Sequence, residues 1–180
     1  MRVIAGTLKG RRLKAPTWDG LRPTSDKLRE TLFNIVGARI DGARVLDGYA
    51  GTGAVGIEAL SRGAAEVTFI ESDPRATALV EANLALCGVE RGYTIQRGDV
   101  ASVLQRLPAG AAFDLIFLDP PYDAAAVMQA LESAAAVLDA DGLVVLERAT
   151  RREPEIPAAL ARVRDVKSGD STLTFMTRPR

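Results

Sequence analysis

From residue 43 onward, short apolar segments alternate with segments of helical periodicity, and no other feature of the sequence restricts the fold as strongly. Apolar strands that are linked through helices by short connections form a parallel sheet with helices on both faces. The expected strands are residues 43–47, 67–71, 93–96, 113–118 and 143–147, and the expected helices are residues 53–62, 100–107 and 124–138, with another that begins at Pro74.

The last part of the chain departs from this alternation. A short helix is expected near residues 155–161, followed by strands near 162–167 and 172–178. Residues 167–171, which connect these strands, are too few for a crossover, so at least one of the two strands must be antiparallel. We therefore predict an α/β fold: a Rossmann-like, doubly wound and mostly parallel sheet of seven strands, with an antiparallel C-terminal strand.

An N-terminal appendage, residues 1–36, is expected to precede the main domain, residues 37–180. Two strand-like segments, residues 2–5 and 11–14, are separated by a glycine-bracketed connection, which predicts a small β-hairpin. From Thr24 onward, apolar residues recur at helical spacing and predict a helix.

Charge is unevenly distributed along the chain. The formal net charge is zero, yet the first 30 residues contain eight Lys or Arg and three Asp or Glu, a balance of +5. A basic segment on an otherwise acidic body predicts contact with a polyanion. A basic hairpin that only faces solvent would carry the same charges, and the sequence leaves both interpretations open.

Several classes of protein are disfavoured by what the sequence lacks. It contains no histidine, which excludes Ser-His-Asp and Cys-His nucleophiles and the common zinc sites, so we expect no metal. Cys87, the single cysteine, lies in an apolar helical stretch and is expected in the core. With no apolar run of about 18 residues and no signal-peptide segment, we expect a cytoplasmic protein, and nothing demands more than a monomer.

Four of the expected strands end at, or just before, an acid. The carboxyl ends of parallel strands meet at one edge of a sheet, and ligands bind there near the topological switch point. The acids should therefore line one crevice; they are Asp47, Glu71, Asp99 and Asp119.

A glycine-rich turn follows the first of these strands, and residues 51–56 match Gly-x-Gly-x-x-Gly, a pattern also found in NAD-binding proteins. A carboxylate at the start of the turn suits a cation better than a pyrophosphate. S-adenosylmethionine carries a sulfonium and an ammonium group but no phosphate, and glycines let the backbone approach such a ligand closely. The turn residues expected to bind it are Asp47, Gly48, Tyr49, Ala50, Gly51 and Gly53.

Two of the other strand-end acids are expected to bind the same cofactor. Glu71 is placed to accept hydrogen bonds from the ribose hydroxyls. Asp99 is placed to accept from the adenine amino group, with Val100 packed against the ring, and Asp99 would also serve as a helix N-cap.

The strand over residues 113–118 runs into Asp119-Pro120-Pro121-Tyr122, the most specific motif in the chain. Proline cannot continue a sheet and leaves carbonyl groups without strand partners. We expect the Asp119 carboxylate and the Pro120 carbonyl to clamp an NH2 group, and Tyr122 to stack on a planar ring. An exocyclic base amine is a poor nucleophile, and such a clamp would stabilise the charge that develops during methyl transfer.

With these motifs the sequence resembles the class I S-adenosylmethionine-dependent methyltransferases. More narrowly, it resembles the RsmD family of bacterial enzymes that methylate guanine N2 in 16S ribosomal RNA. The resemblance covers nearly the whole chain. Its specific part is Arg22-Pro23-Thr24 together with Arg29-Glu30-Thr31-Leu32-Phe33-Asn34, whereas the nucleotide-site motifs indicate only the class.

The resemblance implies that Arg22, Pro23 and Thr24 lie against the cofactor and the catalytic loop. It implies a partner, 16S ribosomal RNA or the small ribosomal subunit. At one position the sequence departs from the family, because Ser168 stands where many relatives are expected to have an aromatic residue. The basic residues expected to bind RNA are Lys9, Arg11, Arg12 and Lys14.

Three other functions are compatible with parts of the sequence. The clamp suits the amine of adenine or cytosine in DNA, although no target-recognition domain is evident. An RNA-binding assembly factor without turnover would keep the fold but would have little reason to keep four converging acids. An NAD-dependent oxidoreductase is disfavoured by Asp47 and by the short chain.

Overall fold

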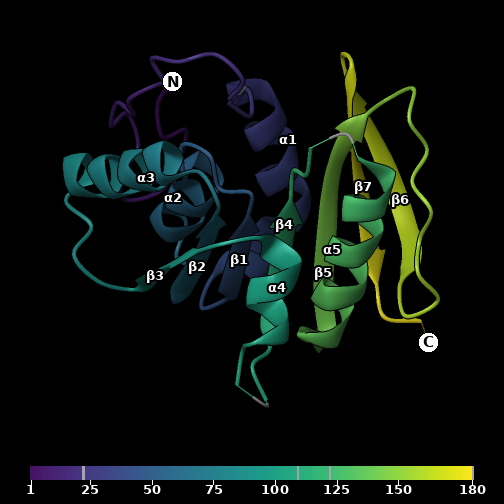
Figure 1. Ribbon diagram of the computed structural model, residues 1–180. Coiled ribbons are helices and arrows are strands. Elements are labelled where there is room, and N and C mark those ends of the chain that lie inside the picture. The colour runs from purple at the N-terminus through teal and green to yellow at the C-terminus, as the bar shows by residue number, and fades with distance from the viewer. Residues whose placement is uncertain (22, 109, 122, 180) are drawn as a thin grey trace.

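One mixed sheet of seven strands, in the order β3-β2-β1-β4-β5-β7-β6, forms the centre of the protein (Figure 1). The computed structural model describes residues 1–21, 23–108, 110–121 and 123–179. The strands are β1 (Arg44–Gly48), β2 (Glu66–Glu71), β3 (Tyr93–Arg97), β4 (Phe113–Leu118), β5 (Leu138–Ala149), β6 (Ala161–Ser168) and β7 (Ser171–Thr177). The helices are α1 (Asp26–Val36), the 3-10 helix η1 (Gly37–Ile40), α2 (Ala54–Ser61), α3 (Pro74–Cys87), α4 (Val100–Gln105) and α5 (Ala124–Ala136).

The strands β1 to β5 are parallel, as the alternation of strands and helices predicts. β7 is antiparallel to both of its neighbours, β5 and β6. The mostly parallel seven-stranded sheet and its antiparallel C-terminal strand are thus confirmed. The chain order runs outward in both directions from β1 and β4, so the topological switch point lies between these two strands.

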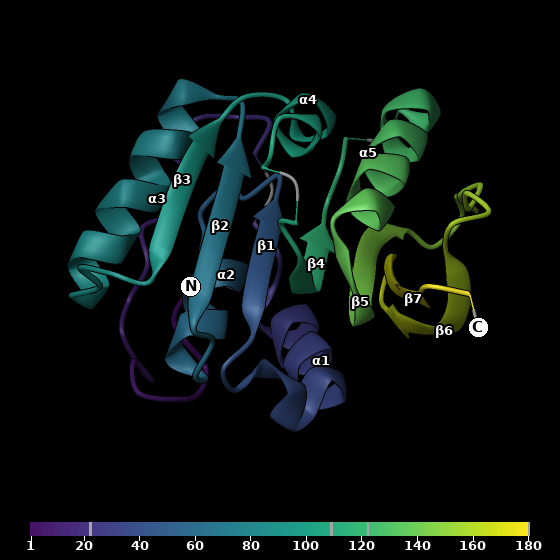
Figure 2. The same ribbon diagram turned by 90° about the horizontal axis from the view of Figure 1, so that it is seen from below.

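Helices cover both faces of the sheet because each strand points alternate apolar side chains into two separate cores. Val45 and Phe69 face α1, α2 and α3, and Cys87 of α3 lies in this same core, as predicted. Leu46 and Ile116 face α4 and α5 on the other side. Figure 2 shows α4 and α5 across the sheet from α1.

Four of the helices begin at a side chain that caps their free N–H groups. Asp73 caps α3, where Pro74 occupies the first position, and Asp99 caps α4 by accepting from the Ser102 N–H at 2.9 Å. Ser25 and Asp123 cap α1 and α5. None of the helices in the described part of the chain is long and apolar enough to cross a membrane.

The N-terminal β-hairpin predicted from the sequence is not formed. One bridge pairs Arg2 with Arg12, and a few backbone hydrogen bonds join the two segments beside it, among them one from the Val3 N–H to the Arg11 carbonyl at 2.9 Å. The N–H groups of Ile4 and Ala5 donate instead to the buried carboxylate of Glu58 in α2, at 2.8 and 3.0 Å. Because these donors are satisfied by α2, they cannot extend a strand ladder, and the segment packs against the helix.

The short helix predicted near residues 155–161 is also wrong. The structure has a turn there, in which the Leu160 N–H donates to the Pro157 carbonyl at 2.9 Å. Pro157 disfavours helical backbone at the residue before it, and the three residues between Pro157 and β6 are too few for a helix.

Candidate active site

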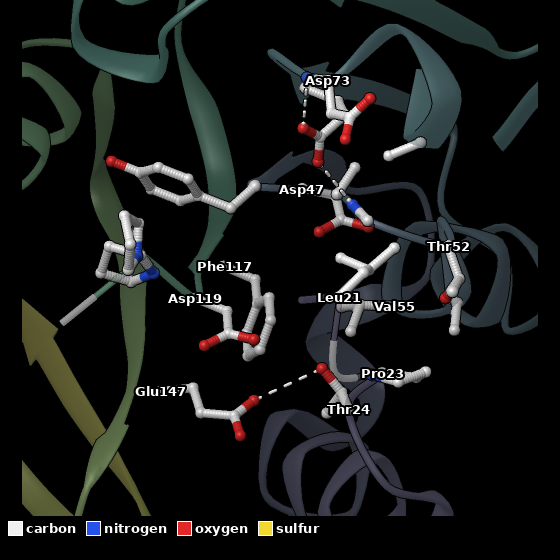
Figure 3. Close-up of a pocket in the computed structure, with 18 of the residues that line it drawn as sticks. Leu21, Pro23, Thr24, Asp47, Thr52, Val55, Asp73, Phe117, Asp119 and Glu147 are labelled. Atoms are coloured by element: carbon white, nitrogen blue, oxygen red, sulfur yellow. Dashed lines mark hydrogen bonds between the residues drawn. The ribbon is translucent and has the colours of Figure 1, made fainter. Parts of the chain in front are cut away.

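The acids predicted at the strand ends line a single cavity with a volume of about 810 Å³ (Figure 3). Asp47 lies in β1, Glu71 ends β2 and Asp119 directly follows β4. Each stands two residues beyond an apolar residue of the core under α1, α2 and α3, so strand alternation directs all three side chains to that face. Asp99, in the loop between β3 and α4, completes the set.

Most of the residues predicted to bind the cofactor or the amine lie at this cavity, and three do not. Gly48, Gly53 and Val100 pack beneath the cavity rather than along its wall. Arg22 and Tyr122 lie outside the described residues, so their roles stay predictions. The predicted residues that line the cavity are Pro23, Thr24, Asp47, Tyr49, Ala50, Gly51, Glu71, Asp99, Asp119, Pro120 and Pro121.

Asp47 is the most deeply buried of these carboxyl groups, with 1% of its surface exposed. Its Oδ2 accepts a hydrogen bond from the Gly56 N–H at 2.8 Å, which ties β1 to the first turn of α2. Burial raises the pKa of Asp47 to about 8; the Gly56 hydrogen bond opposes this rise, and the charges of Asp119 and Glu71 add to it. A cationic ligand would stabilise the ionised form of such a group.

Glu71 fastens the loop after β1 to the end of β2. Its Oε2 accepts from the Gly51 N–H at 2.9 Å, and its Oε1 accepts from the Asp73 N–H at 2.8 Å. Each carboxylate oxygen has a second lone pair, so Glu71 can still accept hydrogen bonds from the hydroxyl groups of a ligand. The backbone thus holds this carboxylate in place before a ligand binds.

The loop after β1 contains two glycines in the left-handed conformation, and they serve different contacts. Gly51 has φ 58° and Gly53 has φ 75°, values that glycine adopts without strain. A Cβ on Gly51 would lie 3.1 Å from Leu21 Cδ1, at the wall of the cavity. A Cβ on Gly53 would lie 3.1 Å from Val80 Cγ1 of α3. Gly53 therefore lets α3 pack closely, and its predicted contact with a cofactor stays a prediction.

The segment after β4 places Asp119, Pro120 and Pro121 at the wall of the cavity. Asp119 is half-buried and Pro120 is buried. The Pro121 carbonyl accepts from the Asp123 N–H at 2.7 Å, at the start of α5. Of the two proline carbonyls, that of Pro120 is therefore the better candidate for holding an amine together with Asp119.

A fifth acid, Glu147 of β5, lines the cavity and was not predicted (Figure 3). It ends the strand expected over residues 143–147, so the rule that identified the other acids would have found it. The turn between β6 and β7, residues 168–171, also lines the cavity. Ser168, where many relatives are expected to have an aromatic residue, thus lies at the site itself.

The cavity is strongly acidic. Among the described residues that line it, Arg75 is the one Lys or Arg, and its guanidinium is paired with Asp73 at 2.7 Å and lies over the Trp18 ring. Such a wall attracts a cationic ligand and repels a phosphate group. Eight Asp or Glu side chains line it: Asp19, Asp47, Glu71, Asp73, Asp99, Asp119, Glu147 and Asp170.

The basic residues predicted to bind RNA lie outside the cavity, on the surface of the N-terminal segment. The four side chains, Lys9, Arg11, Arg12 and Lys14, are exposed. The segment is anchored where the Lys14 N–H donates to Asn83 Oδ1 at 2.7 Å. Their exposure is compatible with the predicted contact, which stays a prediction.

Comparison with known proteins identifies relatives over almost the full chain. The model of a family described as "Conserved hypothetical protein 95" matches residues 1–177. "Putative rRNA methyltransferase YlbH" of Bacillus subtilis is 39% identical over 87% of this chain and 86% of its own length. "Ribosomal RNA small subunit methyltransferase D" of Escherichia coli is 39% identical over 68% of this chain and 60% of its own length.

A solved structure shows the same similarity in three dimensions. "Putative methyltransferase yhhF from Escherichia coli" superposes with a TM-score of 0.87 and 32% sequence identity. The match covers 99% of this chain and 97% of that one, so it includes the N-terminal segment as well as the sheet.

Proposed function

The chain belongs to the Conserved hypothetical protein 95 family, the RsmD family of methyltransferases, and on that basis we propose that it transfers a methyl group from S-adenosylmethionine to the N2 amine of a guanine in small-subunit (16S) ribosomal RNA. The observation that carries this proposal is that Asp119 and Pro120 share one acidic cavity with Asp47 and Glu71. A clamp for a planar amine and a site for a cationic methyl donor then lie next to each other.

The side chains that line the cavity fit S-adenosylmethionine better than a dinucleotide. Eight Asp or Glu side chains suit a sulfonium and an ammonium group, whereas the negative charge of this wall would repel a pyrophosphate. In the proposed arrangement Asp47 lies near the positive end of the cofactor. Glu71 accepts from the ribose hydroxyls, and Asp99 accepts from the adenine amino group.

The clamp acts on the nitrogen of the base. When bound, S-adenosylmethionine supplies an electrophilic methyl group on positively charged sulfur. The amine nitrogen would accept this methyl group, and sulfur would keep the electron pair of the carbon–sulfur bond that breaks. Asp119 and the Pro120 carbonyl stabilise the positive charge on nitrogen, and Asp119 accepts the proton that nitrogen loses.

The N-terminal segment, with Lys9, Arg11, Arg12 and Lys14, is proposed to hold the phosphate backbone of the RNA. Its four cations are exposed, whereas the cavity is acidic, so backbone and base are handled by separate surfaces. A ribosomal substrate also implies a cytoplasmic location.

Replacing Asp119 by alanine tests the clamp. We expect Asp119→Ala to lower kcat by about 100-fold or more and to leave S-adenosylmethionine affinity within a few-fold, because the cofactor contacts lie elsewhere in the cavity. The matched control is Glu132→Ala, which removes an exposed carboxylate of α5. Turnover close to wild type in Asp119→Ala would refute the clamp.

The substrate is tested by following labelled methyl groups. Wild-type protein should label small-subunit particles from cells that lack the enzyme, and mass spectrometry should place the methyl group on a guanine N2. Calorimetry should show binding of S-adenosylmethionine and none of NAD. Label that enters duplex DNA instead would favour an amino-methyltransferase of DNA, and RNA binding without any label would favour an assembly factor.

A further inference from the structure

Glu147 stands directly beside Asp119 at the edge of the sheet. β4 and β5 are parallel neighbours, and Leu118 lies opposite Leu146 in their register, so Asp119 and Glu147 occupy the next level. Neighbouring strands are about 4.8 Å apart. Both acids stand two residues beyond members of one core, Phe117 and Val145, so their side chains share a face. Figure 3 shows the two carboxylates projecting side by side.

Two hydroxyl groups from distant parts of the chain position this carboxylate. The Thr24 hydroxyl donates to Glu147 Oε2 at 3.4 Å, and the Ser171 hydroxyl donates to Oε1 at 3.2 Å. Thr24 precedes α1, and Ser171 begins β7. Glu147 is half-buried, so its carboxylate is both fixed and open to the cavity. An acid held in this way is better placed to recognise a functional group of a ligand than to serve only as an exposed surface charge.

Two adjacent carboxylates match the hydrogen-bonding edge of guanine and mismatch the other amine-bearing bases. Guanine presents two kinds of donor in a row, the N1–H and the N2 amine, separated by a single carbon. Adenine and cytosine present a ring nitrogen with a lone pair next to their amine. A carboxylate only accepts hydrogen bonds, so it would face a guanine donor favourably and an adenine or cytosine lone pair unfavourably.

We propose that Glu147 selects guanine by accepting a hydrogen bond from its N1–H while Asp119 and the Pro120 carbonyl hold the N2 amine. The inference rests on the proposed function, and adds to it the residue that determines which base is methylated. Extruded bases are read along this same edge in other enzymes that act on them. Rejection of a base that lacks the donor is strong, because the carboxylate of Glu147 would then face the lone pair of a ring nitrogen instead of an N–H group.

The test exchanges guanine for 2-aminopurine, which keeps the N2 amine but has a lone pair at N1. Small-subunit particles are rebuilt with either base at the site where mass spectrometry has located the methyl group. Wild-type protein should prefer guanine over 2-aminopurine by about 100-fold or more in kcat/KM, since a charge-assisted hydrogen bond is replaced by a repulsion.

Glu147→Gln is the informative variant, because its amide can donate to the 2-aminopurine lone pair. Its kcat/KM should fall by about 10- to 100-fold on guanine and rise on 2-aminopurine, so that the preference narrows or reverses. The missing O6 of 2-aminopurine affects both proteins alike and cancels from this comparison. Glu155→Gln, an exposed acid in the loop after β5, should retain the wild-type preference.

Each result separates this inference from the proposed function. Wild-type protein that does not methylate guanine overturns the proposed function. Wild-type protein that methylates guanine and 2-aminopurine equally well overturns the role of Glu147, and this measurement does not depend on whether any variant folds. An active Glu147→Gln variant with the wild-type preference overturns it as well.

Discussion

Replacing Glu58 by glutamine should destabilise the protein more than any exposed substitution, because four donors converge on this one carboxylate. Glu58 is fully buried in α2. Its Oε2 accepts from the Ile4 N–H at 2.8 Å and from Arg29 at 3.3 Å, and its Oε1 accepts from the Ala5 N–H at 3.0 Å and from Arg62 at 2.8 Å. Glutamine has one acceptor oxygen, so its NH2 group must face one of these two pairs of donors.

The size of the expected loss of stability follows from the positive charge of Arg29, which stays in the core when Glu58 loses its charge. The Arg29 side chain is also fully buried, and without Glu58 its remaining ion pair is to Asp26, whose side chain is half exposed. Breaking one side of a buried ion pair costs about 3–5 kcal/mol. That is a large part of the roughly 5–15 kcal/mol that stabilises a typical domain. For a chain of this size it corresponds to a fall in Tm of roughly 6–20 °C.

Urea denaturation of wild type and Glu58→Gln measures the loss directly. Hydrogen exchange of the N-terminal segment should rise with it, because the Ile4 and Ala5 N–H groups lose their acceptor. Glu81→Gln, an exposed position of α3, is the matched control and should change stability by less than about 0.5 kcal/mol. A loss below about 1 kcal/mol in Glu58→Gln would show that the buried network contributes far less than its geometry implies.

Three further outcomes are expected from the same structure. Gly56→Ala places a Cβ 2.2 Å from Phe69 Cε1 and should cost about 1–3 kcal/mol in urea denaturation, despite the better helix propensity of alanine; unchanged stability would contradict the close packing. Asp47 has a pKa of about 8 in the folded protein and near 4 in the unfolded chain, so between these pH values only the folded protein holds its proton. Its contribution therefore makes the free energy of unfolding fall as the pH rises from about 4 to about 8. The slope is up to about 1.4 kcal/mol per pH unit and should disappear in Asp47→Asn, whereas equal slopes in both proteins would refute the shift. Replacing Arg11 and Arg12 by glutamine should weaken RNA binding and reduce the slope of log K against log salt concentration by about 0.7 per charge lost. An unchanged slope would show that these two side chains do not contact RNA phosphates.

Much of the fold could be predicted from local patterns. The alternation of short apolar segments with helical ones predicts the parallel order, and the short connection before Ser171 predicts the antiparallel strand. Asp73 with Pro74 marks the start of α3 because both act within one turn of the backbone. These features depend on neighbours in the sequence, so periodicity alone reveals them.

The N-terminal segment shows where such reasoning fails. Its residues have the alternation of a hairpin, but the Ile4 and Ala5 N–H groups find an acceptor in Glu58, more than 50 residues away. A buried carboxylate binds N–H groups more strongly than a neutral carbonyl does. No local pattern indicates that competition, which exists only once α2 has packed beside the segment.

The candidate site, like the fold, combines features that adjacent residues reveal with contacts that only the tertiary structure creates. By itself the sequence determined that acids follow the strands and that Asp119-Pro120-Pro121 ends one of them, because both are properties of adjacent residues. Only the tertiary structure decided that Glu147 stands level with Asp119, that Thr24 and Ser171 hold it, and that Gly53 makes room for Val80. Strand register and helix packing set these contacts, and both arise from burying apolar surface among segments far apart in the chain.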